Sequence, residues 1–375
     1  MKKLIYLGVL AVLISGCNSM KMKVTVTNTI DLARVAETIE IPYAEITSHL
    51  QGIQPGEIVV KNKSGKEIAS QVIYEGNPDP VSLIFQADVN AKARSVYYIV
   101  KGTPAKYEAH AYGRFVPERM DDYAWENDRI AYRIYGTALI AKDGPSNGLD
   151  VWVKRTDKLV VDKWYSEYLA GKNSYHDDNG EGCDCFKVGR TLGAGAMAPY
   201  IKDSLWLGIN FENHQTLDNG PIRTSFRLTY PAFLADSIMV NETRIISLDA
   251  GSQLNKITEE YTGPGEVFPV VAGIVKRAEG KTLSTSTENG VITYRLDIGA
   301  NGVSYIGTVI LTPVFGILET DDHLLIKTIY EPGKKLTYYT GAGWSKWGFE
   351  NDDQWISYMT DYSFKLRNPL VVVIE

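Results

Sequence analysis

The chain has 375 residues, with 39 basic and 45 acidic side chains and a formal net charge of −6. This length predicts two domains, or one large domain with an appendage, and it is ample for a hydrophobic core. An acidic balance without a basic cluster argues against nucleic acid as a partner. The sequence contains no phosphate loop, no dinucleotide fingerprint and no nucleophile elbow, so we expect no cofactor.

The N-terminus has the pattern of a lipoprotein signal peptide. Two lysines precede an apolar run over 4–14, which is too short to span a bilayer, and a Ser-Gly pair precedes Cys17. We therefore predict a signal peptide over 1–16, lipidation of Cys17 and a tether over 17–23. Lipid chains would anchor the protein to a membrane. We expect a bacterial envelope location at the outer membrane, facing the periplasm, because no acidic cluster follows Cys17.

The remainder of the chain reads as all-β. Apolar and polar residues alternate in runs such as 205–211 and 222–230, which is typical of strands with one buried face. Helical patterns are few, and the best are 161–169 and 354–366. A Gly-Thr-Pro break ends at residue 104, and all tryptophans follow it. We predict a small β-sandwich over 24–104 and a larger antiparallel β-sandwich over 105–375.

The densest polar segment spans 175–190 and is punctuated by glycines, which lets backbone and side chains converge on a ligand. His176 can move protons near neutral pH, and Glu181 can orient it or share that work. Lys187 and Arg190 can neutralise an anionic group. The alternative is a solvated loop with incidental charges.

Cys183 and Cys185 lie in the same segment, separated by one residue. Side chains at this spacing on a strand share a side but are poorly placed to bridge, so we expect free thiols. A metal shared with neighbouring carboxylates is a second interpretation. The spacing matches no paired C-x-x-C zinc pattern and only part of a calcium loop, so we assign no metal ligand.

A second segment, 118–136, leads into an alternating strand. Trp125 stands among charged residues, and sugars are bound by aromatic planes beside planar polar groups. Trp347, in an aromatic and acidic loop over 344–355, is a second stacking platform. The alternative is an ion-paired edge with Trp125 in the core. The candidate sugar-binding side chains are Arg119, Asp122, Trp125, Glu126, Arg129, Lys187 and Trp347.

Several strings carry a family resemblance: DYAWENDRIAYRIYG from Asp122, SNGLDVWVKR from Ser146, EGCDCFKVGRTLGAG from Glu181, NGPIRTSFRLTY from Asn219, and the stretch 341–355. The chain resembles the envelope lipoproteins of domain-of-unknown-function family 4861. That resemblance covers nearly the whole mature chain. It implies a galactose-mutarotase-like β-supersandwich in the later part and an association with polysaccharide utilisation, often of uronate-containing glycans such as pectins. It assigns no catalytic residue.

The leading hypothesis is a carbohydrate-active enzyme that cleaves an acidic oligosaccharide by β-elimination at a uronic acid. Arg190, Lys187 and Arg119 would neutralise the carboxylate. His176 would be the base, with Tyr132 or Tyr175 as acid or alternative base. Rival hypotheses are hydrolysis by carboxylates such as Glu181 with Asp122 or Glu126, mutarotase-like epimerisation, and non-catalytic glycan binding.

Overall fold

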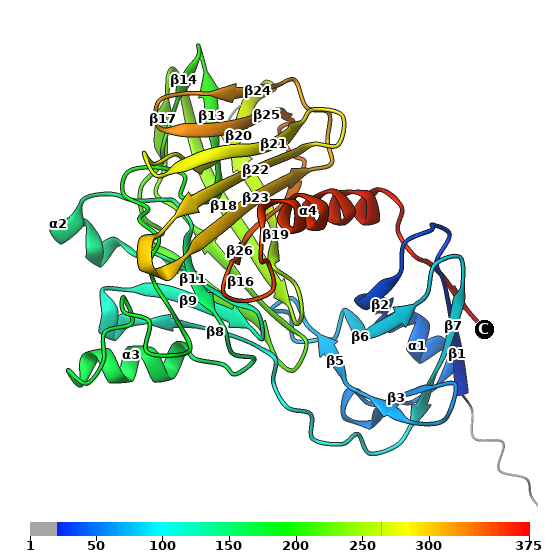
Figure 1. Cartoon of the computed structure of the whole chain (residues 1–375). Coiled ribbons are helices and arrows are strands. Elements are labelled where there is room, and N and C mark those ends of the chain that lie inside the picture. The colour runs from blue at the N-terminus through cyan, green and yellow to red at the C-terminus, as the bar shows by residue number, and fades with distance from the viewer. Residues whose placement is uncertain (1–20, 264) are drawn as a thin grey trace, which may run out of the picture.

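The computed structural model describes residues 21–263 and 265–375 (Figure 1). Cys17, the predicted lipidation site, lies outside the described residues, as do the predicted signal peptide and most of the predicted tether. Among the residues described, no helix has the length and apolar character needed to cross a membrane. Two β-rich units stand side by side, a small one built mainly from the N-terminal part and a larger one from the rest of the chain (Figure 1).

The small unit packs two antiparallel sheets and one helix around its own core. In β1, Met22, Val24 and Val26 are buried and alternate with partly exposed residues, as expected for a strand with one face in a core. The first sheet has the order β27, β1 (Lys21–Thr27), β7 (Arg94–Lys101), β3 (Ile58–Asn62), β4 (Glu67–Ile68). The second has the order β2 (Arg34–Pro42), β6 (Ser82–Val89), β5 (Ser70–Ile73), and α1 (Tyr43–His49) packs on them.

The chain ends in the small unit. The last strand, β27 (Val371–Ile374), pairs antiparallel with β1, with Val24 opposite Ile374. The sequence analysis placed this segment with the larger unit, so the structure corrects its assignment. A short apolar terminal strand carries no local signal of its partner, because pairing depends on which sheet edge is free in the folded chain.

The larger unit contains three antiparallel sheets. The first has the order β12 (Gly182–Cys183), β11 (Asp150–Lys154), β10 (Ile130–Ile134), β9 (Asp122–Asn127), β8 (Ala111–Val116). The second has the order β14 (Ser204–Leu205), β13 (Ala194–Ile201), β20 (Phe268–Val275), β25 (His323–Tyr330), β24 (Gly316–Glu319). The third has the order β15 (Asn213–Asn219), β16 (Arg223–Thr229), β18 (Ile238–Asp249), β19 (Leu254–Thr262), β26 (Leu336–Trp344), β23 (Val303–Ile310), β22 (Val291–Asp297), β21 (Gly280–Ser286), with β17 (Phe233–Ala235) beside β18.

The third sheet organises the larger unit. One face of β18 is fully buried and contributes Val240, Ile246 and Leu248 to the main core, against which the other two sheets pack. The opposite face is partly covered by α4 (Asp352–Arg367) (Figure 1). The helix α3 (Val161–Leu169) covers the outer face of the first sheet, where Trp164 and Tyr165 share a core with Trp152. The short helix α2 (Ile140–Asp143) follows β10 in the chain. The all-β prediction is confirmed, as are the helices predicted at 161–169 and 354–366.

Side chains of the small unit fasten it to the larger one through backbone groups. The Gln71 amide accepts hydrogen bonds from the backbone N–H groups of Ile222 and Arg223, at 3.0 and 2.8 Å. Gln86 donates to the Ala250 carbonyl at 2.8 Å. Buried Arg34 donates to the carbonyls of Lys365 and Asn368 at the C-terminal end of α4, where a cation is favourable. The two units are therefore held in a fixed relation.

Candidate functional site

A buried guanidinium organises the region around the polar loop 173–185. Arg133 on β10 stands opposite Asp150 on β11, and its Nε and Nη2 donate to Asp150 Oδ2 at 2.9 and 2.6 Å. Nη2 also donates to Asp184 Oδ2 at 2.7 Å. All three residues are buried. Burial of one cation with two carboxylates is tolerated only when the group is well hydrogen-bonded, as it is here.

Aromatic rings enclose this guanidinium. The Arg133 carbon Cζ lies 5.0, 5.2 and 5.6 Å from the ring centroids of Tyr135, Trp152 and Tyr175. Trp152 and Tyr175 stack with centroids 5.0 Å apart. Electron-rich ring faces attract a cation, and they exclude water from it. The cluster is therefore rigid on the side that faces the protein.

Asp122 and Arg119 extend the cluster towards the surface. Asp122 is fully buried, accepts a hydrogen bond from Tyr165 Oη at 3.1 Å and lies 3.8 Å from Arg133. Burial raises the pKa of Asp122 to about 6, against the opposing effect of Arg133 and Arg119. The Arg119 guanidinium lies 3.6 Å from Asp122, and its buried Nη1 has no hydrogen-bond partner among the described residues. This Nη1 atom therefore faces Asp122 inside the protein and not solvent.

Tyr175 joins the two arginines. Its hydroxyl oxygen accepts from Arg119 Nε at 3.1 Å and from Arg133 Nη1 at 3.2 Å. Burial raises the pKa of Tyr175, and the two guanidinium groups act in the opposite direction by stabilising the phenolate. A tyrosine with this environment can give up a proton to a reacting oxygen and hold the resulting charge.

His176 is the member of the cluster that meets solvent. Its side chain is 49% exposed, and Nδ1 lies 3.3 Å from Asp184 Oδ2 and 3.2 Å from the Asp184 carbonyl oxygen. A hydrogen bond at Nδ1 leaves Nε2 as the free nitrogen. Burial lowers the pKa of His176 below its ordinary value of 6.5, so the ring is neutral at pH 7 and able to accept a proton.

The two cysteines on either side of Asp184 form a disulfide. Cys183 and Cys185 are bonded, with their Cα atoms 5.6 Å apart. The expectation of free thiols was wrong, because these residues curve out of the strand geometry on which it rested. Neither sulfur is therefore a thiolate ligand. Within 21–263 and 265–375 no group of three or more His, Cys, Asp or Glu side chains is placed to hold a metal.

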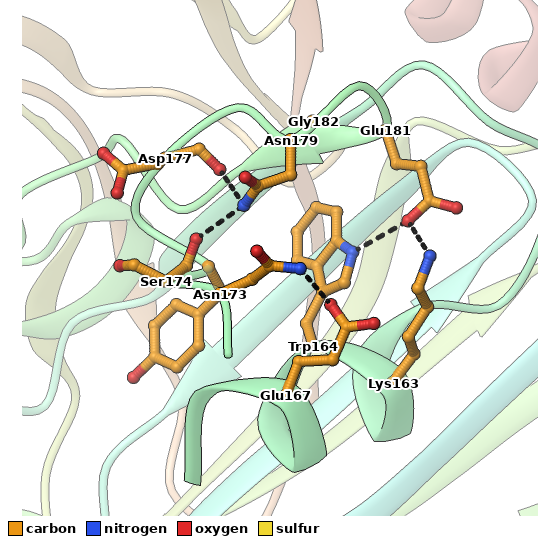
Figure 2. Close-up of a pocket in the computed structure, with 10 residues that line it drawn as sticks. Lys163, Trp164, Glu167, Asn173, Ser174, Asp177, Asn179, Glu181 and Gly182 are labelled. Atoms are coloured by element: carbon orange, nitrogen blue, oxygen red, sulfur yellow. Dashed lines mark hydrogen bonds and ion pairs between the residues drawn. The ribbon is translucent and has the colours of Figure 1, made fainter. Parts of the chain in front are cut away.

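Figure 2 shows a hollow beside the same loop, which Tyr175 also lines. It lies between α3 and residues 173–182 and has a volume of about 70 Å³. Glu181 accepts from Lys163 at 2.8 Å and from the Trp164 indole at 3.2 Å, so this carboxylate is engaged at the hollow's edge (Figure 2). Ligand pockets usually measure about 300–1,000 Å³. This hollow therefore accommodates a small group and not a sugar chain.

The structure corrects the roles predicted for three strand residues. Trp125 and Tyr132 are fully buried and stack on each other in the core, 5.5 Å apart. The Tyr132 hydroxyl donates to the Gln253 carbonyl at 2.6 Å, so it is not a proton donor for substrate. Glu126 is also fully buried, pairs with Lys154 at 2.7 Å and accepts from two backbone N–H groups at the start of α3. These residues face inward because their strands, β9 and β10, are covered on both sides.

Three of the predicted cations also have other surroundings. Arg190 donates to the carbonyls of Leu207 and Gly208 and so holds a neighbouring loop. Arg129 lies beside Asp128 at 3.6 Å, and Lys187 is exposed. Trp347 is half-buried against the core, and the next-door Lys346 lies 3.6 Å from Asp178 in the polar loop. Of the predicted residues, the cluster therefore unites Arg119, Asp122, Tyr175 and His176.

Arg133 and Asp150 form the centre of the cluster, and neither was predicted from the sequence as a site residue. The available signal was a charged residue in an otherwise apolar strand, since Arg133 follows Ile130, Ala131 and Tyr132. Charged residues are rarely buried unless they are paired. A search for cations inside apolar strands would have found both Arg133 and Lys154.

The fold and the cluster define a two-unit β-sandwich protein with a surface histidine backed by buried charges. The chain belongs to the family described as Domain of unknown function (DUF4861), whose profile matches residues 26–372. It is 29% identical over 397 aligned positions to "Uncharacterized protein P7" of Formosa agariphila, an alignment that covers 99% of each chain.

Two solved structures from Enterococcus faecalis share the fold. One is a protein in glycosyl hydrolase family 38, with a TM-score of 0.54 and 10% identity, over 95% of this chain and 47% of that one. The other is an alpha-mannosidase, with a TM-score of 0.51 and 8% identity, over 95% and 46% of the two chains. The chain thus spans about half the length of these structures. At such low identity the likeness establishes the fold alone.

Proposed function

We propose that this protein is carbohydrate-active and cleaves acidic oligosaccharides at the half-exposed His176, with the mostly buried Arg119 and Tyr175 beside it. The observation that carries the proposal is the Tyr175 hydroxyl held between two guanidinium groups, next to a histidine that Asp184 orients. The fold shared with glycoside-hydrolase chains supports a carbohydrate substrate, as does the family resemblance in the sequence.

The reaction proposed is β-elimination at a uronic acid. Arg119, whose side chain is 13% exposed, would bind the sugar carboxylate and acidify the proton on the adjacent carbon. Neutral His176 would take that proton, so that a carbon–carbon double bond forms while the bond to the leaving oxygen breaks. Tyr175 would donate its proton to that oxygen, and the two guanidinium groups would stabilise the phenolate.

Two-carboxylate hydrolysis receives less support. Glu126 lies in the core with Lys154, Asp122 is fully buried, and Glu181 is held by Lys163 and Trp164. None of the carboxylates considered from the sequence is free to activate water at the surface. The proposal also retains the bacterial envelope location through lipidated Cys17, which only the sequence supports.

The test compares His176→Ala with wild type on oligogalacturonates, following the ultraviolet absorbance of the unsaturated product. Loss of general-base catalysis should lower kcat by about 10²–10⁴-fold. His49→Ala, at an exposed position on α1 of the small unit, is the matched control and should retain wild-type turnover. Because the His176 pKa lies below 6.5, kcat/KM should rise with pH and level off by neutrality.

Formation of a saturated product would show that the reaction is hydrolysis and not elimination. Binding without formation of any product would show that the protein binds glycans without cleaving them. Full activity of His176→Ala would remove this histidine from the mechanism.

A further inference from the structure

A large cleft lies between the two units. It has a volume of about 460 Å³, within the usual range for ligand sites and well above that of the hollow beside α3. Its walls come from β2, from the outer face of the third sheet and from α4. In Figure 1 this region lies where α4 approaches the small unit, away from α3.

Aromatic rings form one wall of the cleft. Tyr339 comes from β26, and Tyr358 and Tyr362 lie one helical turn apart on α4. Ring centroids are 5.8 Å apart for Tyr339 and Tyr362, and 5.9 Å for Tyr358 and Tyr362. The Tyr358 hydroxyl accepts from the backbone N–H of Gln253 at 3.1 Å, which fixes that ring. Half-buried tyrosines offer apolar faces and polar edges, as sugar rings require.

Two cations in the cleft have no partner. Lys256 on β19 and Lys365 on α4 line it, and neither ammonium makes an ion pair or hydrogen bond with any residue the structure describes. The nearby Arg223 differs, because Asp249 binds it through both oxygens at 2.6 and 3.0 Å and Glu40 lies at 3.0 Å. The two lysines are thus free to attract an anionic ligand, whereas the arginine is part of the wall.

The rim of the cleft carries a strained bulge. The pairing of β2 with β6 shifts register between Arg34 and Glu37, which leaves Val35 75% exposed and Ala36 at φ 49°. A left-handed backbone is unfavourable at alanine, and here the Ala36 N–H donates to Asp88 at 2.8 Å. Bulges of this kind recur beside functional sites, where they redirect a strand. Because Arg34 also binds the end of α4, the rim and the helix are fixed together.

We propose that this cleft is a second carbohydrate site, which binds a stretch of an acidic oligosaccharide chain. The tyrosines stack on sugar rings, and Lys256 and Lys365 bind the carboxylates. The inference rests on the proposed function for the class of ligand, but its residues are separate from those of the His176 cluster. The cleft would hold a long chain to the protein while short substrates react without it.

The test uses Lys256→Glu/Lys365→Glu and isothermal titration with a galacturonate hexamer. The matched control is Lys63→Glu/Lys66→Glu, which makes the same charge change on an exposed turn of the small unit. We expect the cleft variant to bind at least tenfold more weakly and the control to bind as wild type does. Lys256→Ala/Lys365→Ala should show a smaller loss, and a glucose hexamer should bind poorly to every variant.

The outcomes separate the two proposals. An unchanged Kd in the cleft variant, with product formation still dependent on His176, overturns the cleft site alone. Weakened hexamer binding without any product in wild type overturns the elimination chemistry alone. Absence of hexamer binding to wild type, or equal binding of the neutral hexamer, overturns the cleft site together with the preference for acidic glycans.

Discussion

Two buried arginines in the larger unit each pair with carboxyl groups of two acidic residues, but their surroundings differ. Arg133 lies between Asp150 and Asp184 at one end of the first sheet. Arg244 on β18 lies between Glu242 at 2.6 Å and Glu259 at 2.7 Å. Each is one cation with two carboxylates, but only the first reaches solvent, through half-exposed His176.

The Arg244 cluster is closed on all sides. Glu242, Arg244 and Glu259 are each at most 2% exposed, and the Tyr230 ring lies 5.1 Å from the guanidinium carbon. Burial raises the pKa of Glu259 to about 8, whereas Asp122 in the Arg133 cluster reaches about 6. A buried charge triad is therefore not by itself a sign of catalysis. What distinguishes the Arg133 cluster is a proton-carrying side chain at its surface.

Substitution of Arg244 should have the largest effect on stability. Arg244→Met leaves Glu242 and Glu259 in the core without their cation, and we expect the free energy of unfolding to fall by about 3–5 kcal/mol. Urea unfolding followed by circular dichroism measures it. Arg227→Met, on the outer face of the neighbouring β16, is the control and should change stability by at most about 0.5 kcal/mol. A loss below about 1 kcal/mol for Arg244→Met would contradict the assigned role of the triad.

The pH dependence of the free energy of unfolding should reveal the raised pKa of Glu259. Its folded-state pKa of about 8 lies above the ordinary 4.5, so between these values the folded protein keeps a proton that the unfolded chain has released. Stability should therefore fall as pH rises from about 4.5 to 8, by at most about 1.4 kcal/mol per pH unit. Glu259→Gln should flatten this decline, and Glu260→Gln, on the opposite face of β19, should retain it. Equal slopes in all three proteins would show that Glu259 does not titrate in this way.

The smallest stability effect should come from the disulfide beside Asp184. The bond closes a loop of only three residues, so Cys183→Ala/Cys185→Ala should cost about 1–2 kcal/mol. The functional effect should be clearer, because Asp184 orients His176. Nuclear magnetic resonance titration of His176 should yield a changed pKa in the variant, while the pKa of His214 on β15 stays constant. An unchanged His176 titration would mean that the disulfide does not position Asp184.

The sequence predicted more of the elements than of the site. Period-two alternation in runs such as 222–230 identified strands, and the aromatic faces at 161–169 and 354–366 identified helices. These signals are local, because one buried face imposes a periodic pattern on the residues of a single element. The same kind of local evidence identified the segment 175–190 as dense in charged residues.

Residue patterns alone predicted the all-β architecture, the two principal helices and the family to which the chain belongs. The tertiary structure decided that Trp125 is core, that Arg133 meets Asp184, and that the last strand completes the small unit's sheet. It also decided the cleft, whose walls come from residues 35–38, β19 and α4. The reason is physical: burial, pairing and cavities depend on contacts between segments far apart in the chain, and no pattern within one segment records its distant neighbours.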